Sequence, residues 1–168
     1  MSINQEEKYH GAAILRLFET INLKIPSLKF SLGNGKSRNC YIIEGIRPSL
    51  IGRGQIISCG VYIKTSNARR SPWRFNFHKT QQDEILELKK HYGEVFVIFS
   101  NGDDGFACLS FEELKDILDD VHEEQEWVAV KRAYKRGYRI SGNNGERENV
   151  LRKNAFPDSI INWFQAKS

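Results

Sequence analysis

Alternating apolar and polar side chains predict two strands near the middle of the chain. In residues 61–65, valine and isoleucine point to one face, while Tyr62 and Lys64 point to the other. The alternation resumes in residues 73–77, where tryptophan and two phenylalanines share one face and Arg74 lies on the other. The intervening loop is polar and basic and contains a proline. We therefore expect the two strands to display lysine and arginine beside an aromatic core.

The same periodicities predict the other elements. Apolar residues spaced three and four apart predict helices at residues 6–21, 80–92 and 111–121, and a short C-terminal helix around residues 156–164. Alternating or continuous apolar runs predict further strands at residues 28–32, 40–44, 55–65, 94–99, 106–109, 127–130 and 138–140. Because residues 94–99 are almost entirely apolar, we expect an inner strand that is covered on both faces. The pattern predicts an α/β or α+β fold, with a mixed central sheet flanked by helices.

Short polar motifs predict the ends of two helices. Thr80, with Asp83 three residues later, is typical of an N-cap, and Gly93 is typical of a C-terminal stop. Ser110, with Glu113 at the third helical position, forms a capping-box pattern. The buried stripe of the helix that follows Ser110 is expected to comprise Leu114, Ile117, Leu118 and Val121.

The composition is that of a folded protein. A chain of 168 residues that is 40% hydrophobic and 27% charged fits one globular domain over residues 1–168. No apolar run approaches the length of a membrane span, and the N-terminal residues lack a signal-peptide pattern. Three well-separated cysteines without a CxxC pair favour reduced, buried thiols. We therefore expect a cytoplasmic protein that does not contact a membrane.

Charge is distributed unevenly along the sequence, although the net formal charge is only +4. Residues 20–82 hold eleven bases and one acid, Glu44, whereas residues 83–126 hold fourteen acids and three bases. Folding can separate such blocks into a basic and an acidic pole, or interleave them so that they cancel. Both arrangements remain open from the sequence.

The order of elements around Lys64 resembles that of the PD-(D/E)XK, or restriction-endonuclease-like, nucleases. The resemblance covers residues 9–118: a helix, strands, a strand ending in Lys-Thr-Ser, an aromatic strand, a helix and a buried strand. Lys64 matches the lysine of the family motif, but Tyr62 stands where the family has an acid. Glu44 stands at the place of the metal-binding aspartate, and Glu19 at the place of a helical glutamate.

The resemblance implies a restriction-endonuclease-like core and a Mg²⁺-dependent catalytic site on Lys64, Glu44 and Glu19, with Glu44 as the metal ligand. Magnesium polarises a phosphoryl group and activates water, and it usually takes one or two carboxylates from the protein. Tyr62 cannot replace a carboxylate ligand, because its phenol is neutral near pH 7. The sequence therefore favours a nuclease-like protein that binds nucleic acid and cuts it weakly or not at all.

Basic residues on and near the two central strands are the candidate phosphate contacts, with DNA favoured over RNA as the ligand. These residues are Lys64, Arg69, Arg70, Arg74 and Lys79. Tyr62 and Trp127 are candidates for stacking on bases. Engagement of both Arg69 and Arg70 in ion pairs within the protein would argue against a phosphate-binding role.

Two other classes of function remain open from the sequence. One is an active metal-dependent endonuclease with an atypical site on Glu44 and Lys64, joined by Glu19 or His10. The other is a protein-interaction module whose acidic segment, residues 103–126, binds a basic partner. Ordinary structural roles also remain open, with Lys64 as a solvated strand lysine and Glu44 as an ion-pair partner. A homodimer is compatible with the sequence.

Overall fold

The computed structural model describes residues 2–22, 29–32, 37–133, 135 and 137–166. Its helices are α1 (Gln5–Asn22), α2 (Lys79–Tyr92), α3 (Phe111–Lys115), α4 (Ala155–Gln165) and the 3₁₀ turn η1 (Gly102–Asp104). Its strands are β1 (Lys29–Leu32), β2 (Cys40–Arg47), β3 (Gln55–Thr65), β4 (Trp73–His78), β5 (Val95–Ser100), β6 (Phe106–Ser110), β7 (Gln125–Ala133) and β8 (Gly137–Gly142). The first residue of the predicted strand 28–32 lies outside the described residues.

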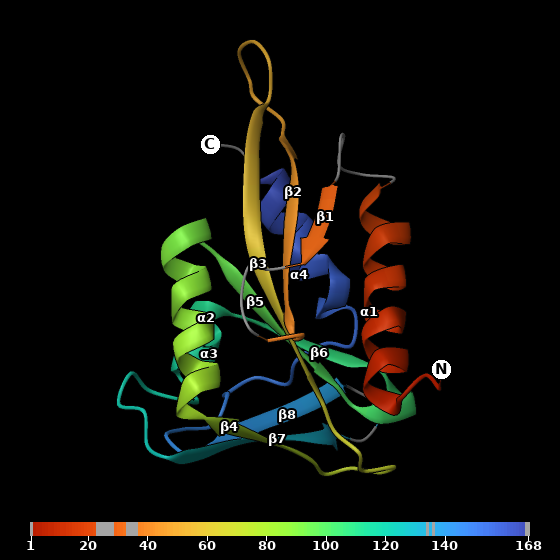
Figure 1. Ribbon diagram of the computed structural model, residues 1–168, viewed down its shortest axis with the longest axis vertical. Helices are drawn as coiled ribbons and strands as arrows, with labels where there is room; N and C mark the ends of the chain where they lie inside the picture. The colour runs from red at the N-terminus through yellow and green to blue at the C-terminus, as the bar shows by residue number, and fades with distance from the viewer. Residues whose placement is uncertain (1, 23–28, 33–36, 134, 136, 167–168) are drawn as a thin grey trace.

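A five-stranded mixed sheet forms the centre of the fold, as predicted (Figure 1). Its strands lie in the order β1-β2-β3-β5-β6, and only β3 and β5 run parallel to each other. Every residue of β5 is buried, so the prediction of an inner strand is confirmed. Helices α1 and α4 pack against one face of this sheet, and α2 and α3 pack against the other.

A second, three-stranded antiparallel sheet was not predicted. It has the order β4-β7-β8 and lies across one end of the central sheet (Figure 1). Strands β3 and β4 follow each other in sequence, yet they belong to different sheets, and the loop of residues 66–72 carries the chain from one to the other. The basic loop between the two predicted central strands is thus a connection between sheets.

Aromatic packing joins the two sheets. Trp73, Phe75 and Phe77 alternate with exposed residues along β4 and are all buried, as predicted. The rings of Phe75 and Phe77 contact Phe99 of β5, with centroid distances of 4.9 and 6.1 Å. The second sheet is therefore fixed to the central sheet through one aromatic face, and its other face points away from the core.

The start of α2 differs from the prediction, whereas the predicted stop of α2 and the cap of α3 agree with it. Helix α2 begins at Lys79, so the predicted N-cap at Thr80 is wrong; the cap is His78, whose backbone N–H donates to Oε1 of Gln81 at 3.2 Å. The predicted stop at Gly93 is confirmed, with φ at 76° in the left-handed region. The Ser110 cap is confirmed as well, because its hydroxyl accepts from the backbone of Glu113.

The helix after Ser110 is much shorter than the predicted 111–121. Leu114, Ile117 and Leu118 are buried as expected, but Val121 is 72% exposed. The turn that follows β8 intervenes: the backbone N–H of Asn144 donates to the carbonyl of Ile117 at 3.0 Å. The helix has already ended by then, because the backbone N–H of Ile117 donates to the carbonyl of Leu114, three residues back, at 3.0 Å; the bond from Asn144 prevents the carbonyl of Ile117 from extending it further.

Within the described residues, no helix combines the length and apolar character that crossing a membrane requires.

We expect Phe99→Ala to lower the free energy of unfolding by about 3–5 kcal/mol, the usual cost of removing a buried phenylalanine ring. Phe99 is completely buried where the two sheets meet. Urea unfolding followed by circular dichroism measures the change. Leu50→Ala is the control, because Leu50 is 75% exposed and should change stability by less than about 0.5 kcal/mol. A change as small in Phe99→Ala would contradict the packing of the sheets.

Candidate nucleic-acid interface

Lys64, at the carboxyl end of β3, is engaged inside the protein. Its Nζ donates to the backbone oxygen of Asn76 at 2.7 Å and to Oε1 of Gln81 at 3.0 Å. The ammonium also lies 4.9 Å from the centre of the Phe77 ring, within the range of a cation–π contact. Lys64 therefore ties β4 and the first turn of α2 to the central sheet. Lys64 is therefore not a freely solvated strand lysine. It is also not a free phosphate ligand, because its ammonium is already bonded within the protein.

Burial sets the protonation of Lys64. It lowers the pKa of the ammonium to about 8, and the carboxylates of Glu6 and Glu84 oppose this shift. The side chain is thus mainly charged at pH 7 and loses its charge within a unit or two above that. Near neutral pH the cation is held by two hydrogen bonds and an aromatic face.

Tyr62 occupies the position at which the nuclease motif has an acid, and it lies in the core. Its side chain is completely buried, so the prediction that it stacks on bases is wrong. Its hydroxyl donates to Oε2 of Glu84 at 3.2 Å, and burial raises the pKa of the phenol. Sequence reasoning missed Glu84, although its spacing of three residues from Gln81 places both on the side of α2 that faces β3.

The two acids proposed for catalysis lie away from Lys64. Glu44 pairs in register with Ser58, six residues before Lys64 along β3, a separation of about 20 Å at ~3.3 Å per residue. Its carboxylate forms an ion pair with Lys29 at 3.6 Å, so the ion-pair interpretation of Glu44 holds, with a lysine as the partner. Glu19 is exposed near the end of α1. It lies about 20 Å along the helix, at ~1.5 Å per residue, from Glu6, the residue of α1 whose charge acts on Lys64. Glu44, Glu19 and Lys64 are not brought together.

His10, the other candidate for a nuclease site, is a core histidine. Its Nδ1 lies 2.9 Å from the hydroxyl of Tyr41, and its ring is buried. Burial lowers the pKa of the imidazole, which favours the neutral ring. Its role is therefore to hydrogen-bond within the packing of α1 on the central sheet.

The residues present do not fit a magnesium site. Among the described residues, no three histidine, cysteine or acidic side chains converge in a way that could hold a metal ion. Glu44 is paired with a lysine and has no second carboxylate beside it, whereas Mg²⁺ needs an octahedral set of oxygen ligands. Cys40, Cys59 and Cys108 are buried, as predicted, and burial raises the pKa of each thiol, so none is a ready thiolate ligand.

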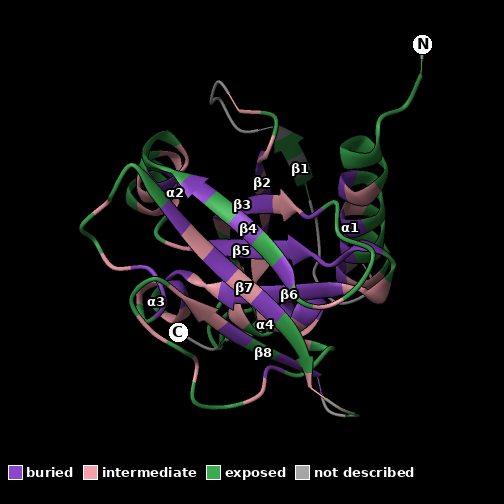
Figure 2. Ribbon diagram, turned by 90° about the horizontal axis from the view of Figure 1, so that it is seen from below, coloured by how far each residue is buried: buried purple, intermediate pink, exposed green. Residues whose placement is uncertain are grey.

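The outer face of the second sheet carries several exposed cations that form no ion pair within the described residues. Figure 2 looks onto this sheet, and no described element covers it in that view. Register and exposure define its outward residues, which we call the outer face: Arg74, Asn76, His78, Gln125, Trp127, Ala129, Lys131, Ala133, Arg139 and Ser141. None of these strand positions is acidic, but the exposed Glu146 lies opposite Ser141 in an isolated bridge, so one acid borders the outer face at its β8 edge.

Three cations lie close together on the outer face. Lys131 of β7 is directly opposite Arg139 of β8, a position at which Cβ atoms are about 5 Å apart. Arg74 of β4 is opposite Ala129 and thus diagonal to Lys131, at about 7–8 Å. All three side chains are exposed, and within the described chain none forms an ion pair. Arg132, on the opposite face of β7, is instead paired with Asp104.

Trp127 is the aromatic residue of the outer face. It is half-buried and lies opposite Asn76, diagonal to Arg74 on the side away from Lys131. The guanidinium of Arg74 lies 5.1 Å from the centre of the indole ring, a cation–π contact. Arg74 therefore lies between the aromatic end of the outer face and the end that carries Lys131 and Arg139.

The loop of residues 66–72 adds two arginines at the cationic end. Arg69 and Arg70 are exposed, and within the described residues neither forms an ion pair, so the condition set against a phosphate-binding role is not met. The loop is held in place: Nε1 of Trp73 donates to the carbonyl of Ala68 at 3.1 Å, and the backbone N–H of Arg132 donates to Ser71 Oγ at 2.9 Å. The second bond places the loop beside the end of β7 that carries Lys131.

Lys79 is exposed at the first position of α2, directly after β4. Four of the five predicted phosphate contacts therefore surround or lie on the second sheet, and Lys64 does not. Lys131 and Arg139 were missed as candidate contacts. Alternation places Arg139 outward within the predicted strand 138–140, and it places Lys131 outward if the predicted strand 127–130 is continued by one residue.

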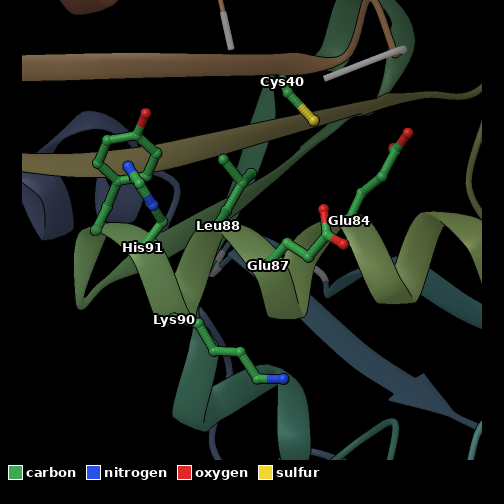
Figure 3. A pocket seen from close by; sticks show the side chains of 7 residues that line it. Cys40, Glu84, Glu87, Leu88, Lys90 and His91 are labelled. Carbon is green, nitrogen blue, oxygen red and sulfur yellow. The ribbon is translucent and has the colours of Figure 1, made fainter. Parts of the chain in front are cut away.

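Two hollows lie elsewhere on the molecule. A pocket of about 420 Å³ lies between α2 and Cys40; Figure 3 shows Glu84, Glu87 and His91 rising toward Cys40 while Lys90 points away. Its carboxylates make it unfavourable for a polyanion. A groove of about 690 Å³ between α1 and the loop 66–72 is lined by Lys8 and Arg69 but also by Asp103.

The acidic segment 103–126 is partly neutralised within the protein. Asp104 pairs with Arg132 and Lys153, Glu113 with Arg147, and Asp120 with Lys115. These contacts interleave part of the acidic block with basic residues, whereas the strand positions of the outer face carry no acid and Glu146 lies at its β8 edge.

No protein-family model, curated protein or solved structure matches the chain. The outer face and its surrounding loop are therefore the basis for assigning a function.

We expect the wild-type protein to gain stability relative to Lys64→Met as the pH rises from 8 toward 10. The folded-state pKa of Lys64 is lowered to about 8, whereas in the unfolded chain it is near the ordinary 10.5. Between these values the unfolded chain binds the extra proton, so the free energy of unfolding rises with pH. Below pH 8 the difference between the two proteins should stay constant.

Urea unfolding of both proteins between pH 7 and 9.5 measures this difference. The comparison removes the titration of cysteines and tyrosines, which both proteins share. Lys79→Met is the matched control, because it removes a lysine that is exposed. A constant difference for Lys64→Met would show that Lys64 is not desolvated.

Proposed function

We propose that the protein binds nucleic acid through phosphate contacts on the outer face of the second sheet, with DNA as the first ligand to test. The observation that carries this proposal is the position of Lys131 directly opposite Arg139, with Arg74 diagonal to them and no acid among the outward residues. Like charges directly opposite each other destabilise a sheet. A polyanion removes that repulsion, and neutral surroundings do not.

A nucleic acid carries closely spaced negative phosphates that can pair with these neighbouring cations. Phosphates bound by lysine and arginine release condensed counterions, and this release drives binding without reading sequence. The proposed contacts are Arg69, Arg70, Arg74, Lys79, Lys131 and Arg139. Lys64 is left out, because both of its strong hydrogen bonds are made within the protein.

The order of elements supports a restriction-endonuclease-like core as part of this proposal. The chain runs α1, β1, β2, β3, β4, α2, β5, and β4, the aromatic strand of the expected order, belongs to the second sheet. This order agrees with the expectation that the nuclease resemblance raised. The acids expected of an active member are not gathered at Lys64, so we propose binding without cleavage.

The double variant Lys131→Ala/Arg139→Ala should weaken binding of duplex DNA and reduce its dependence on salt. If each side chain neutralises one phosphate, the slope of log K against log salt becomes shallower by about 1.8. The loss should be equal for unrelated sequences, because phosphate contacts carry no base information. Fluorescence anisotropy with labelled duplexes at several salt concentrations measures both quantities.

Lys29→Ala/Lys90→Ala is the charge-matched control, because β1 and the end of α2 lie away from the second sheet in Figure 1. This control should leave the slope unchanged. Equal effects of the two double variants would assign binding to net charge alone. No binding of any nucleic acid at low salt would refute the proposal and turn attention to the acidic segment 103–126.

Supercoiled plasmid incubated with the protein and Mg²⁺ or Mn²⁺ should stay intact, because the described acids form no metal cage. Agarose gels with DNA and with an RNA transcript measure cleavage. Metal-dependent cutting that disappears in Glu44→Ala or Lys64→Ala would replace the non-cutting binder with an active nuclease. Cutting that persists unchanged in both variants would indicate a contaminating nuclease.

A further inference from the structure

The two ends of the outer face differ in chemistry. Lys131, Arg139 and the loop arginines occupy one end, which therefore suits phosphates. Trp127 occupies the other end, about 13 Å from Lys131 at ~3.3 Å per residue along β7. Around it the outward residues are neutral or weakly basic: Asn76, His78 and Gln125.

Small side chains occupy the central part of the outer face. In the central row, Ala129 lies opposite Arg74 and Ser141 lies opposite Ala129, and both have small side chains; Glu146 ends the row beyond Ser141. A chain of nucleotides crossing from the cationic end to Trp127 meets no bulky obstruction there except Arg74. Arg74 is long and can reach a phosphate, because among the described residues its guanidinium contacts only the Trp127 ring.

Resting on the proposed function, we propose that the outer face is a platform for single-stranded nucleic acid, in which a base stacks on Trp127. Arg74 occupies the ring in the free protein, moves to a phosphate on binding, and leaves the indole to the base. The exposed side-chain amide of Asn76, opposite Trp127, lies where it can hydrogen-bond the edge of that base.

A duplex cannot use this platform in full. Its bases are stacked on one another inside the double helix and present only edges to a protein, so a tryptophan on a flat sheet finds no open base face. A single strand exposes base faces as well as phosphates, and stacking on aromatic side chains is the common way in which proteins hold such strands. The combination of Trp127 with the cationic end therefore selects single strands.

The test compares a labelled 12-nucleotide single strand with the matching 12-base-pair duplex, by anisotropy, at equal salt. Wild-type protein should bind the single strand more tightly. Trp127→Leu should weaken single-strand binding by roughly 5- to 100-fold, the effect of losing one stacked base, and leave duplex binding within about twofold. Trp127→Phe should restore most of the single-strand affinity, because phenylalanine retains an aromatic face. DNA and RNA single strands are tested in parallel, since both offer base faces.

Lys131→Ala is the internal comparison, since loss of a phosphate contact should weaken both ligands alike. Failure of each proposal has its own signature. Absence of binding to both ligands defeats the proposed function itself. Equal binding of strand and duplex, with no effect of Trp127→Leu, defeats the single-strand platform and leaves phosphate binding intact. Loss of both ligands in Trp127→Leu, with a lowered melting temperature and no rescue by phenylalanine, assigns Trp127 a structural role and also defeats the platform.

Discussion

Burial of the aromatic face of β4 is the constraint on which the rest of the structure depends. Trp73, Phe75 and Phe77 are at most 2% exposed, and the two phenylalanine rings contact Phe99 of the central sheet. Because side chains alternate along a strand, burying these three sends Arg74 and Asn76 outward without any further choice. Strands β7 and β8 then continue that outward face through their register. The display of cations is thus a direct result of core packing.

Lys64 matches a catalytic motif in sequence but has a structural role in this fold. Its position at the end of β3 agrees with the nuclease pattern, but its ammonium bonds to Asn76 and Gln81. These bonds hold β4 and α2 in place, and β4 in turn carries Arg74. Lys64 therefore supports the proposed binding surface from behind, through the backbone of the strand that forms it. The acid that faces this region is Glu84, which bonds to Tyr62.

The local elements were largely predictable from the sequence, and the long-range pairings were not. Periodicity indicated the buried strand β5, the alternation of β4 and the cap at Ser110, because these features depend on neighbours in sequence. The second sheet depends on β4 meeting β7, some fifty residues later, and no local pattern encodes that pairing. For the same reason Lys131 and Arg139 were missed, and Glu44 was placed near Lys64 although register sets it beside Ser58. The segment after α3 also contacts a distant turn, through the bond between Asn144 and Ile117, which no local pattern predicts.

The opposed pair of Lys131 and Arg139 gives salt two contrary effects on this protein. In the free protein, added ions screen a repulsion between two strands and so favour the folded state. In the proposed complex with a nucleic acid, the same ions would compete with phosphate for the same two side chains and favour dissociation. A ligand that binds only the folded chain also raises its stability by mass action. At this pair of side chains, concentrated salt would therefore act in the free protein as the proposed polyanion would act in dilute buffer: each relieves the repulsion between β7 and β8.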